Sequence, residues 1–225
     1  MKKFNISAFC AKKSDPVPSK FWGISYKDGK MIASNTLVLA SVKADYPAEY
    51  EGGIYAGDVR IFDETIPAEM VLEQGRAKTL AVSLPIAELK AACKVCRDSG
   101  KAMGAVEFVA IPFGDNQKLL FKRTLLSKIL TACECFGIKG MHISESRPYS
   151  SAYLTDGNGN EFAIMPAYPA FAYVDLSGRI HDYPFLIDDL IRQAEIALKD
   201  AGKPQEQAKA ASHLISLKFI KSRLA

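Results

Sequence analysis

The alternation of hydrophobic and polar residues separates extended segments of the chain from helical ones. Near the N-terminus, two short apolar runs flank residues 27–30 (Lys-Asp-Gly-Lys), and an Asp-Gly pair between such runs is a strong signal for a β-hairpin. A short helix is expected over 7–13, because the prolines that follow it stop helix continuation. Residues 44–74 mix turn signals with one expected strand near 53–56. The N-terminal third therefore predicts mainly β-structure.

Two helices, each with one buried stripe, are predicted in the middle of the chain. The first opens at Pro85 and has apolar residues at spacings of three and four, namely Ile86, Leu89, Cys93 and Cys96. The second runs from Thr124 to Phe136 and stops at Gly137, a residue type that commonly ends helices. Short strands are expected at 79–82, 107–111 and 118–121.

Residues 141–165 predict an antiparallel meander. Three β-type runs cover 141–146, 151–155 and 161–165, and the sequence Asp-Gly-Asn-Gly-Asn at 156–160 forms the turn between the last two. From Pro184 the pattern becomes helical again, with a break at Gly202 and Pro204.

These patterns predict an α+β fold in which antiparallel sheets carry helices on one face, followed by a helical appendage. We expect residues 1–174 to form the α+β region, with 1–75 and 76–174 as candidate subregions, and residues 175–225 to form the appendage. Its apolar helix faces would pack on a sheet or on another subunit.

The composition is that of a folded protein with a core. The chain has 225 residues, of which 48% are hydrophobic and 24% charged, and this excludes disorder throughout. No apolar run approaches the ~18 residues that a membrane span needs, and the first residues lack the apolar stretch of a signal peptide. We therefore expect a cytoplasmic protein. The net charge of +4 permits nucleic-acid binding but does not by itself indicate it.

Three short motifs raise the question of a metal or nucleotide. Four thiolates, those of Cys93, Cys96, Cys133 and Cys135, could close a zinc site, but three of them fall on apolar helix stripes, where cysteine acts as a small hydrophobe. An odd total of five cysteines, including Cys10, favours reduced thiols. The turn at 156–160 copies half of a calcium loop and lacks the glycine and glutamate of the other half, and no Walker-type phosphate loop occurs. We expect neither a metal nor another cofactor.

The three histidines, His142, His181 and His213, stand apart in sequence without a recognisable nucleophile or metal partner. No acid–base or nucleophile pair can be named, so the chain is predicted not to be an enzyme. A catalytic triad assembled in space from distant residues is an alternative that one sequence leaves open.

A line of positive charge is predicted on the helix that opens at Pro85. Four basic residues recur at spacings of four, three and four, within one narrow arc about a quarter-turn from the buried stripe: Lys90, Lys94, Arg97 and Lys101. We call these four residues the basic ridge. Such a ridge suits contacts to phosphates without base readout, and the alternative is an ordinary solvated helix face.

The stretch from Phe121 to Tyr168 resembles the C-terminal end of bacterial DNA sliding clamps, the β subunits of DNA polymerase III. The family has a leucine-rich helix start, a strand, a serine- and proline-containing link into a strand, an acidic-glycine turn and a last strand ending in Met-Pro. The matching segments here are Thr124–Leu126, Met141–Ile143, Ser146–Leu154, Asp156–Gly157 and Phe162–Pro166. A weaker similarity covers residues 4–6 and 24–35, which look like the opening strand and hairpin of a clamp.

The resemblance implies a ring-forming, non-enzymatic protein that binds double-stranded DNA without sequence preference and acts as a platform for polymerase-type partners. Helices would line the inside of the ring and sheets the outside. The family's last strand helps to form a groove for short partner peptides. Its counterparts, with the residues of the preceding link, are Tyr149, Ser151, Ile164, Met165 and Pro166.

Two departures from the family pattern affect this expectation. Bacterial clamps repeat the domain three times, whereas this chain has room for about one and a half copies, so several copies would have to assemble into a homo-oligomer. The helical appendage also follows the Met-Pro strand, where clamps normally end, so that it could cover the groove. The alternative is a clamp-fold interaction protein that binds only other proteins and does not encircle DNA.

Overall fold

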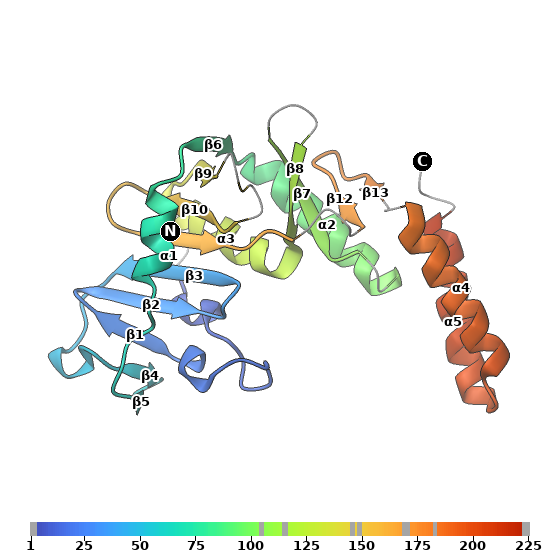
Figure 1. The fold of residues 1–225 in the computed structure, drawn as a ribbon, viewed down its shortest axis with the longest axis horizontal. Coiled ribbons are helices and arrows are strands. Elements are labelled where there is room, and N and C mark those ends of the chain that lie inside the picture. The colour runs from blue at the N-terminus through green and yellow to red at the C-terminus, as the bar shows by residue number, and fades with distance from the viewer. Residues whose placement is uncertain are drawn as a thin grey trace. The chain divides into compact units, whose positions relative to one another are not determined.

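A computed structural model describes residues 4–103, 106–113, 117–144, 147, 150–167, 172–181 and 184–221 (Figure 1). The chain divides into two compact units, and each unit is made of two separate segments. The first unit combines Met1–Ile86 with Thr124–Pro166, and the second combines Ala87–Arg123 with Ala167–Ala225. This division differs from the boundary expected between residues 174 and 175. Each unit is held together by pairing between strands far apart in the chain, and the local sequence contains no signal for such pairing.

The first unit is built on one antiparallel sheet, which contains nine strands within the described residues. Their spatial order is β5-β4-β1-β2-β3-β11-β10-β9-β6. The strands are β1 (Ile24–Lys27), β2 (Lys30–Ser34), β3 (Val38–Lys43), β4 (Ile54–Ala56), β5 (Val59–Phe62), β6 (Leu80–Ser83), β9 (Gly140–Ile143), β10 (Ala152–Thr155) and β11 (Glu161–Ile164). The predicted meander is confirmed, since β10 pairs with both β9 and β11.

The hairpin predicted at the Asp-Gly pair is also confirmed. Lys27 of β1 is paired with Lys30 of β2, and the two residues between them, Asp28 and Gly29, have φ values of 51° and 69°. Two successive residues of positive φ are what a two-residue hairpin turn of type I′ requires, and Asp-Gly tolerates them.

The helix predicted over 7–13 is wrong. A single 3-10 turn, η1 (Ile6–Phe9), is present, and the chain is extended at Cys10. The side chain of Asn5 caps this turn by accepting a hydrogen bond from the Ser7 amide. The amide of Ala11 then donates to the carbonyl of Phe21 at 2.8 Å, so a tertiary hydrogen bond replaces the next helical one.

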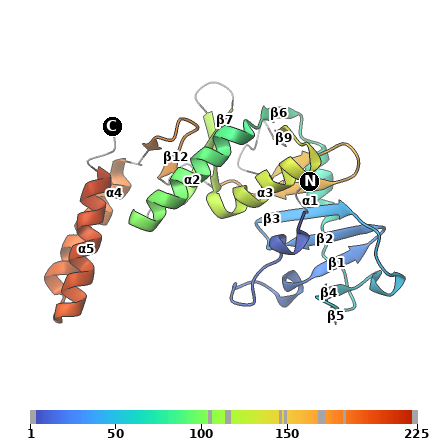
Figure 2. The same cartoon turned by 180° about the vertical axis from the view of Figure 1, so that it is seen from behind.

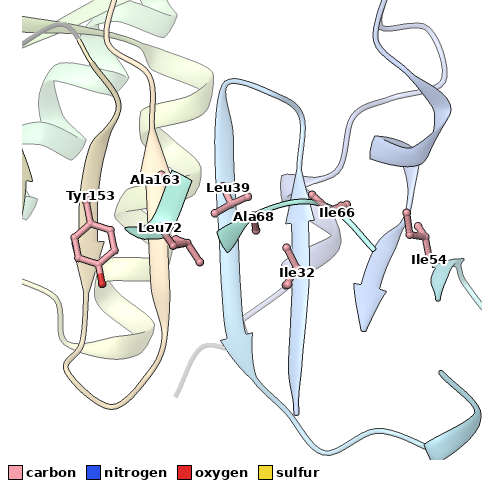
Figure 3. Close-up of a cluster of buried hydrophobic side chains, with 8 residues drawn as sticks. All are labelled: Ile32, Leu39, Ile54, Ile66, Ala68, Leu72, Tyr153 and Ala163. Carbon is pink, nitrogen blue, oxygen red and sulfur yellow. The ribbon is translucent and has the colours of Figure 1, made fainter. Parts of the chain in front are cut away.

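Helices cover both faces of this sheet. On one face, α1 (Glu69–Arg76) packs through Leu72 against the sheet, together with Ile66 and Ala68 that precede it (Figure 3). The sheet residues beneath them are Ile32, Leu39, Ile54, Tyr153 and Ala163. Figures 1 and 2, seen from opposite sides, show α1 in front of the sheet in one view and α3 in front in the other. The sequence predicted neither β5, which lies in the poorly patterned stretch 44–74, nor α1, which begins in that stretch.

Aromatic rings fill the opposite face. Phe162 of β11 lies 5.6 Å, between ring centroids, from Phe136 at the end of α3 (Arg123–Phe136), and 6.0 Å from Phe9 of η1. Phe4 contacts the same three rings. Because successive residues of a strand point to opposite faces, Phe162 faces this cluster while its neighbours Glu161 and Ala163 face α1.

The second unit contains a smaller sheet, of four strands among the described residues, in the order β13-β12-β7-β8. It is antiparallel except that β12 runs parallel to β7. Its elements are α2 (Ile86–Met103), β7 (Phe108–Phe113), β8 (Gln117–Lys122), β12 (Tyr173–Val174), β13 (Ile180–His181), α4 (Pro184–Asp200) and α5 (Pro204–Lys221). The predicted α+β class, with antiparallel sheets and a helical C-terminal segment, is confirmed.

The last two helices form a hairpin. The break between them covers residues 201–203, in agreement with the break predicted at Gly202 and Pro204, and Pro204 is the first residue of α5. An ion pair joins Lys218 of α5 to Glu195 of α4 at 2.9 Å. Among the described helices, none is both long and apolar enough to span a membrane.

A buried carboxylate fastens α1 to the sheet. Glu161 of β11 is 4% exposed and accepts hydrogen bonds from Arg76 Nε (2.7 Å) and Nη2 (2.8 Å), from the Tyr153 hydroxyl (2.8 Å) and from Lys30 Nζ (3.1 Å). Burial alone would raise the pKa of Glu161, but these hydrogen bonds outweigh it and lower the pKa to about 2. The carboxylate therefore stays ionised at neutral pH.

We expect Glu161→Gln to lower the free energy of unfolding by about 2 kcal/mol at pH 7, because Arg76 and Lys30 lose their charged partner. A group whose pKa is lower in the folded state stabilises the fold above its unfolded pKa, near 4.5, and this stabilisation is lost as the pH falls toward 2. Urea unfolding at pH 7 and at pH 3 measures both effects. The difference between wild type and variant should shrink at pH 3.

Glu69→Gln is the matched control, since Glu69 binds the same Arg76 at 2.6 Å but its side chain is 62% exposed. Exposed pairs contribute little, so a change below about 1 kcal/mol is expected. Equal losses from the two substitutions would contradict the role given to the buried carboxylate.

Candidate binding pocket and basic ridge

An apolar pocket of about 290 Å³ opens beside α1, where β2 ends, β3 begins and β11 ends. We call it the apolar pocket. Its lining residues come from four separate segments of the first unit: Ser34, Thr36, Leu37, Val38 and Leu39; Val71 and Gln74; Ser150 and Ser151; and Ala163, Ile164 and Met165. Four of these residues are almost fully buried: Val38, Leu39, Ala163 and Ile164. Leu39 and Ala163 belong to the apolar cluster beneath α1 and form the apolar floor of the pocket.

Two exposed hydrophobic residues form part of the rim. Leu37 is 49% exposed and Met165 is 39% exposed. They are neighbours, because the amide of Met165 donates to the carbonyl of Leu37 at 2.8 Å. Large apolar side chains that stay exposed beside a pocket are typical of interaction sites.

The turn between β2 and β3 positions Leu37. Asn35 Oδ1 accepts hydrogen bonds from the amides of Leu37 (3.1 Å) and Val38 (2.9 Å). Thr36, which lies between Asn35 and Leu37, has a φ of 74°, which is unfavourable for a β-branched residue. The Ser34 hydroxyl supports this conformation by accepting from the Thr36 amide at 3.0 Å. The turn is therefore held in a strained conformation that presents Leu37 outward.

A close approach between α1 and β10 sets the wall of the pocket. A Cβ atom placed on Gly75 would lie 2.5 Å from Cδ2 and 2.9 Å from Cβ of Tyr153. Only glycine therefore allows α1 to lie this close to the sheet, and the neighbouring Gln74 is held at the pocket by the same contact.

A second, more polar opening of about 820 Å³ adjoins the apolar pocket. We call it the cationic pocket. It is lined by Gln74, Ala77, Lys78, Thr79, Ser144, Arg147 and Ser150, so the two pockets share Gln74 and Ser150. The Lys78 ammonium donates hydrogen bonds to the carbonyl and the hydroxyl of Ser151, and burial lowers the pKa of Lys78.

The partner-binding residues expected from the sequence fall partly in the apolar pocket. Ser151, Ile164 and Met165 are lining residues, whereas Pro166 follows Met165 and does not line the pocket. Tyr149 lies outside the described residues. The sequence did not indicate Leu37, Val71 or Gln74 as site residues. Only the pairing of β3 with β11 and the packing of α1 on the sheet bring these residues to the end of β11.

The basic ridge lies on α2, in the second unit. Of the predicted apolar stripe of this helix, Leu89, Cys93 and Cys96 are buried and Ile86 is half-buried, and Ala92 is buried beside them. Lys94 and Arg97 are exposed and Lys90 is half-buried, while Lys101 belongs to the same helix. Arg97 forms an ion pair with its neighbour Asp98 at 3.1 Å. The ridge is thus accessible at two positions at least, and its role stays a prediction.

The cysteines are all free thiols, and all five lie in the described residues. Burial raises the pKa of Cys96 to about 11 and that of Cys133 to about 12, so both remain protonated at neutral pH. In the part of the chain that is described, no group of three or more potential metal ligands occurs.

One histidine has a partner that the sequence analysis did not identify. His181 Nε2 lies 2.7 Å from Asp175 Oδ2, and its ring stacks on Tyr173 with centroids 5.0 Å apart. The other oxygen of Asp175 accepts hydrogen bonds from the turn, at the amides of Ser177 and Arg179. These contacts hold the β12–β13 hairpin closed. The hairpin therefore gives the His181–Asp175 pair a structural role.

No protein-family model matches the chain, and no curated protein matches it. The chain is similar to a DNA polymerase sliding clamp. That crystal structure, from Pseudomonas aeruginosa with a ligand, aligns with a TM-score of 0.44 and 12% sequence identity over 72% of this chain and 61% of the other. The chain thus spans less than two thirds of the length of that protein.

We expect Gly75→Ala to destabilise the first unit. Alanine favours a helix over glycine by about 1 kcal/mol, but a methyl group pressed against the Tyr153 ring costs typically 1–3 kcal/mol, so the net change should be a loss. Thermal unfolding of the variant and of wild type shows whether the substitution lowers or raises the stability of the protein. The control is Glu73→Ala at an exposed position of the same helix, which should leave stability nearly unchanged. A more stable Gly75→Ala protein would show that α1 can move away from the sheet at no cost.

Proposed function

We propose that this chain is a sliding-clamp-like protein that binds double-stranded DNA without sequence preference and acts as a platform for partner proteins, with no catalytic activity of its own. The observation that carries the proposal is the apolar pocket at the end of β11. That strand ends in the Met-Pro sequence on which the resemblance to sliding clamps rests, and Met165 belongs to the pocket rim.

The apolar pocket suits a short peptide better than a cofactor. Its volume of about 290 Å³ is just below the range of about 300–1,000 Å³ typical of small-molecule sites. The floor is apolar and the rim is exposed, so one or two large apolar side chains of an extended segment would bury themselves there at ~25 cal/mol per Å² of apolar surface. We infer that Leu37 and Met165 make the main contacts.

The DNA part of the proposal rests on the basic ridge. Cationic side chains along one helix can neutralise phosphates without reading bases, and such binding is independent of sequence. A chain of this length would encircle DNA only as an assembly of several copies, which is why we also propose self-association.

An observation favours the alternative of a module that binds proteins only. Arg97 is paired with Asp98, and Glu88 is also exposed on α2, so the acidic residues reduce the net charge of the helix surface. The apolar pocket would keep its role under this alternative, whereas DNA binding would be absent.

Peptide binding tests the pocket. The probes are capped ten-residue peptides in which two adjacent large apolar residues stand in a glycine- and serine-rich background, and affinity is measured by fluorescence polarisation. Leu37→Asp and Met165→Asp should each weaken binding at least tenfold, because a carboxylate would be desolvated against the apolar residues.

Met70→Asp is the matched control for the peptide experiment. Met70 lies on α1 and is 65% exposed, yet it is not a lining residue of the apolar pocket. Its substitution should leave peptide affinity unchanged. If all three aspartate variants bind the peptides as wild type does, the pocket is not the binding site.

DNA binding should be weak, indifferent to sequence and strongly reduced by salt. Four phosphate contacts per chain predict a slope of log K against log salt near −4, since each contributes about 0.9. A variant with alanine at Lys90, Lys94, Arg97 and Lys101 should fold normally and lose most of that slope. Titration of a labelled duplex at several salt concentrations measures it. An unchanged slope, or no binding by wild type at low salt, would leave the protein-only module as the better description.

A further inference from the structure

The cationic pocket continues the apolar pocket along the surface of the first unit. The two openings share Gln74 and Ser150, and Ser151 connects them further, because it lines the apolar pocket and holds the Lys78 ammonium. An extended peptide advances about 3.3 Å per residue, so a segment anchored in the apolar pocket would extend into the cationic pocket within a few residues.

Among the residues that the structure describes, the charge lining the cationic pocket is all positive. Its described lining contains two basic residues, Lys78 and Arg147, and no carboxylate. Lys78 and Arg147 also form no ion pair with any acidic residue of the described chain, in contrast to Arg76 and Lys30 nearby. Burial lowers the pKa of Lys78, as expected for an ammonium that is partly desolvated without a compensating negative charge.

We propose that the partner segment carries an aspartate or glutamate side chain next to its apolar residues, and that Lys78 and Arg147 bind this carboxylate. The inference rests on the proposed function of the apolar pocket and names the chemistry of its partner. A carboxylate would supply the missing negative charge and accept charge-assisted hydrogen bonds, which are roughly twice as strong as neutral ones.

The two basic residues would contribute differently. Lys78 is already positioned by its hydrogen bonds to Ser151, so little side-chain freedom is lost when it binds a ligand. Two of its three N–H groups are used in this way, and the third can meet the carboxylate. Arg147 is exposed and presents a planar guanidinium, which can bind both carboxylate oxygens at once.

A peptide series with fixed apolar residues tests the inference. Each peptide keeps the apolar pair and carries one glutamate at one to four residues on either side, with both ends capped to remove terminal charges. The comparison peptide has glutamine at the same position. At one spacing, glutamate should bind wild type about tenfold more tightly than glutamine at low salt, and the advantage should decrease as salt is raised.

Two substitutions locate the effect. Lys78→Gln and Arg147→Gln should each reduce the advantage of glutamate over glutamine while leaving the glutamine peptide's affinity unchanged. Arg147→Gln changes an exposed side chain, so it tests the inference even if Lys78→Gln disturbs the fold. Lys27→Gln, which removes an exposed charge elsewhere in the unit, is the control and should preserve the advantage.

The outcomes separate the inference from the proposed function. Equal affinity for glutamate and glutamine peptides at every spacing would overturn the inference and leave the apolar pocket as a peptide site. An advantage of glutamate that survives both substitutions would also overturn it, because the carboxylate would then bind elsewhere. If none of the peptides binds, including those with the apolar pair alone, the proposed function of the pocket fails and the inference fails with it.

Discussion

The pairing of β3 with β11 is the interaction on which the first unit depends. Four residue pairs, from Glu161↔Ser41 to Ile164↔Val38, join the N-terminal strands to the C-terminal meander. The amide of Lys43 donates to Asn160 Oδ1 in the same region, across 117 residues of sequence. Without this pairing, strands β1 to β5 and the strands of the meander would form two separate smaller sheets. Each would have a further open edge, and neither would have a complete core.

The register of this pairing is fixed by incompatible environments on the two faces of β11. Glu161 needs Arg76, Tyr153 and Lys30 on one face, whereas Phe162 needs the aromatic cluster on the other. A slip of one residue would place the carboxylate among phenylalanine rings and the ring among charged groups. Buried ionic groups add little to net stability when they replace a hydrophobic contact, but here the group specifies one register over its neighbours.

The apolar pocket follows from the same arrangement. The β3–β11 pairing brings Leu37 beside Met165, and the hydrogen bonds of Glu161 hold α1 over the sheet, so that Val71 and Gln74 close the pocket wall. Gly75 permits the helix to approach closely enough for this. The binding surface is therefore a consequence of core contacts, and substitutions in the core would change its shape even where they touch no ligand.

The sequence by itself determined the local elements whose signals are local. The Asp-Gly hairpin, the meander, the amphipathic stripes of α2 and α3 and the break before α5 were predicted, because turn chemistry and periodicity depend on residues close in the chain. It also indicated Ile164 and Met165 as site residues, through the Met-Pro strand. Tertiary structure alone decided the 3-10 turn at η1, the position of α1, the His181–Asp175 pair and the contribution of Leu37 and Lys78 to the pockets. Most of these features depend on contacts between segments that are far apart in the chain. Neither segment has a periodicity or a residue spacing from which its partner segment could be identified.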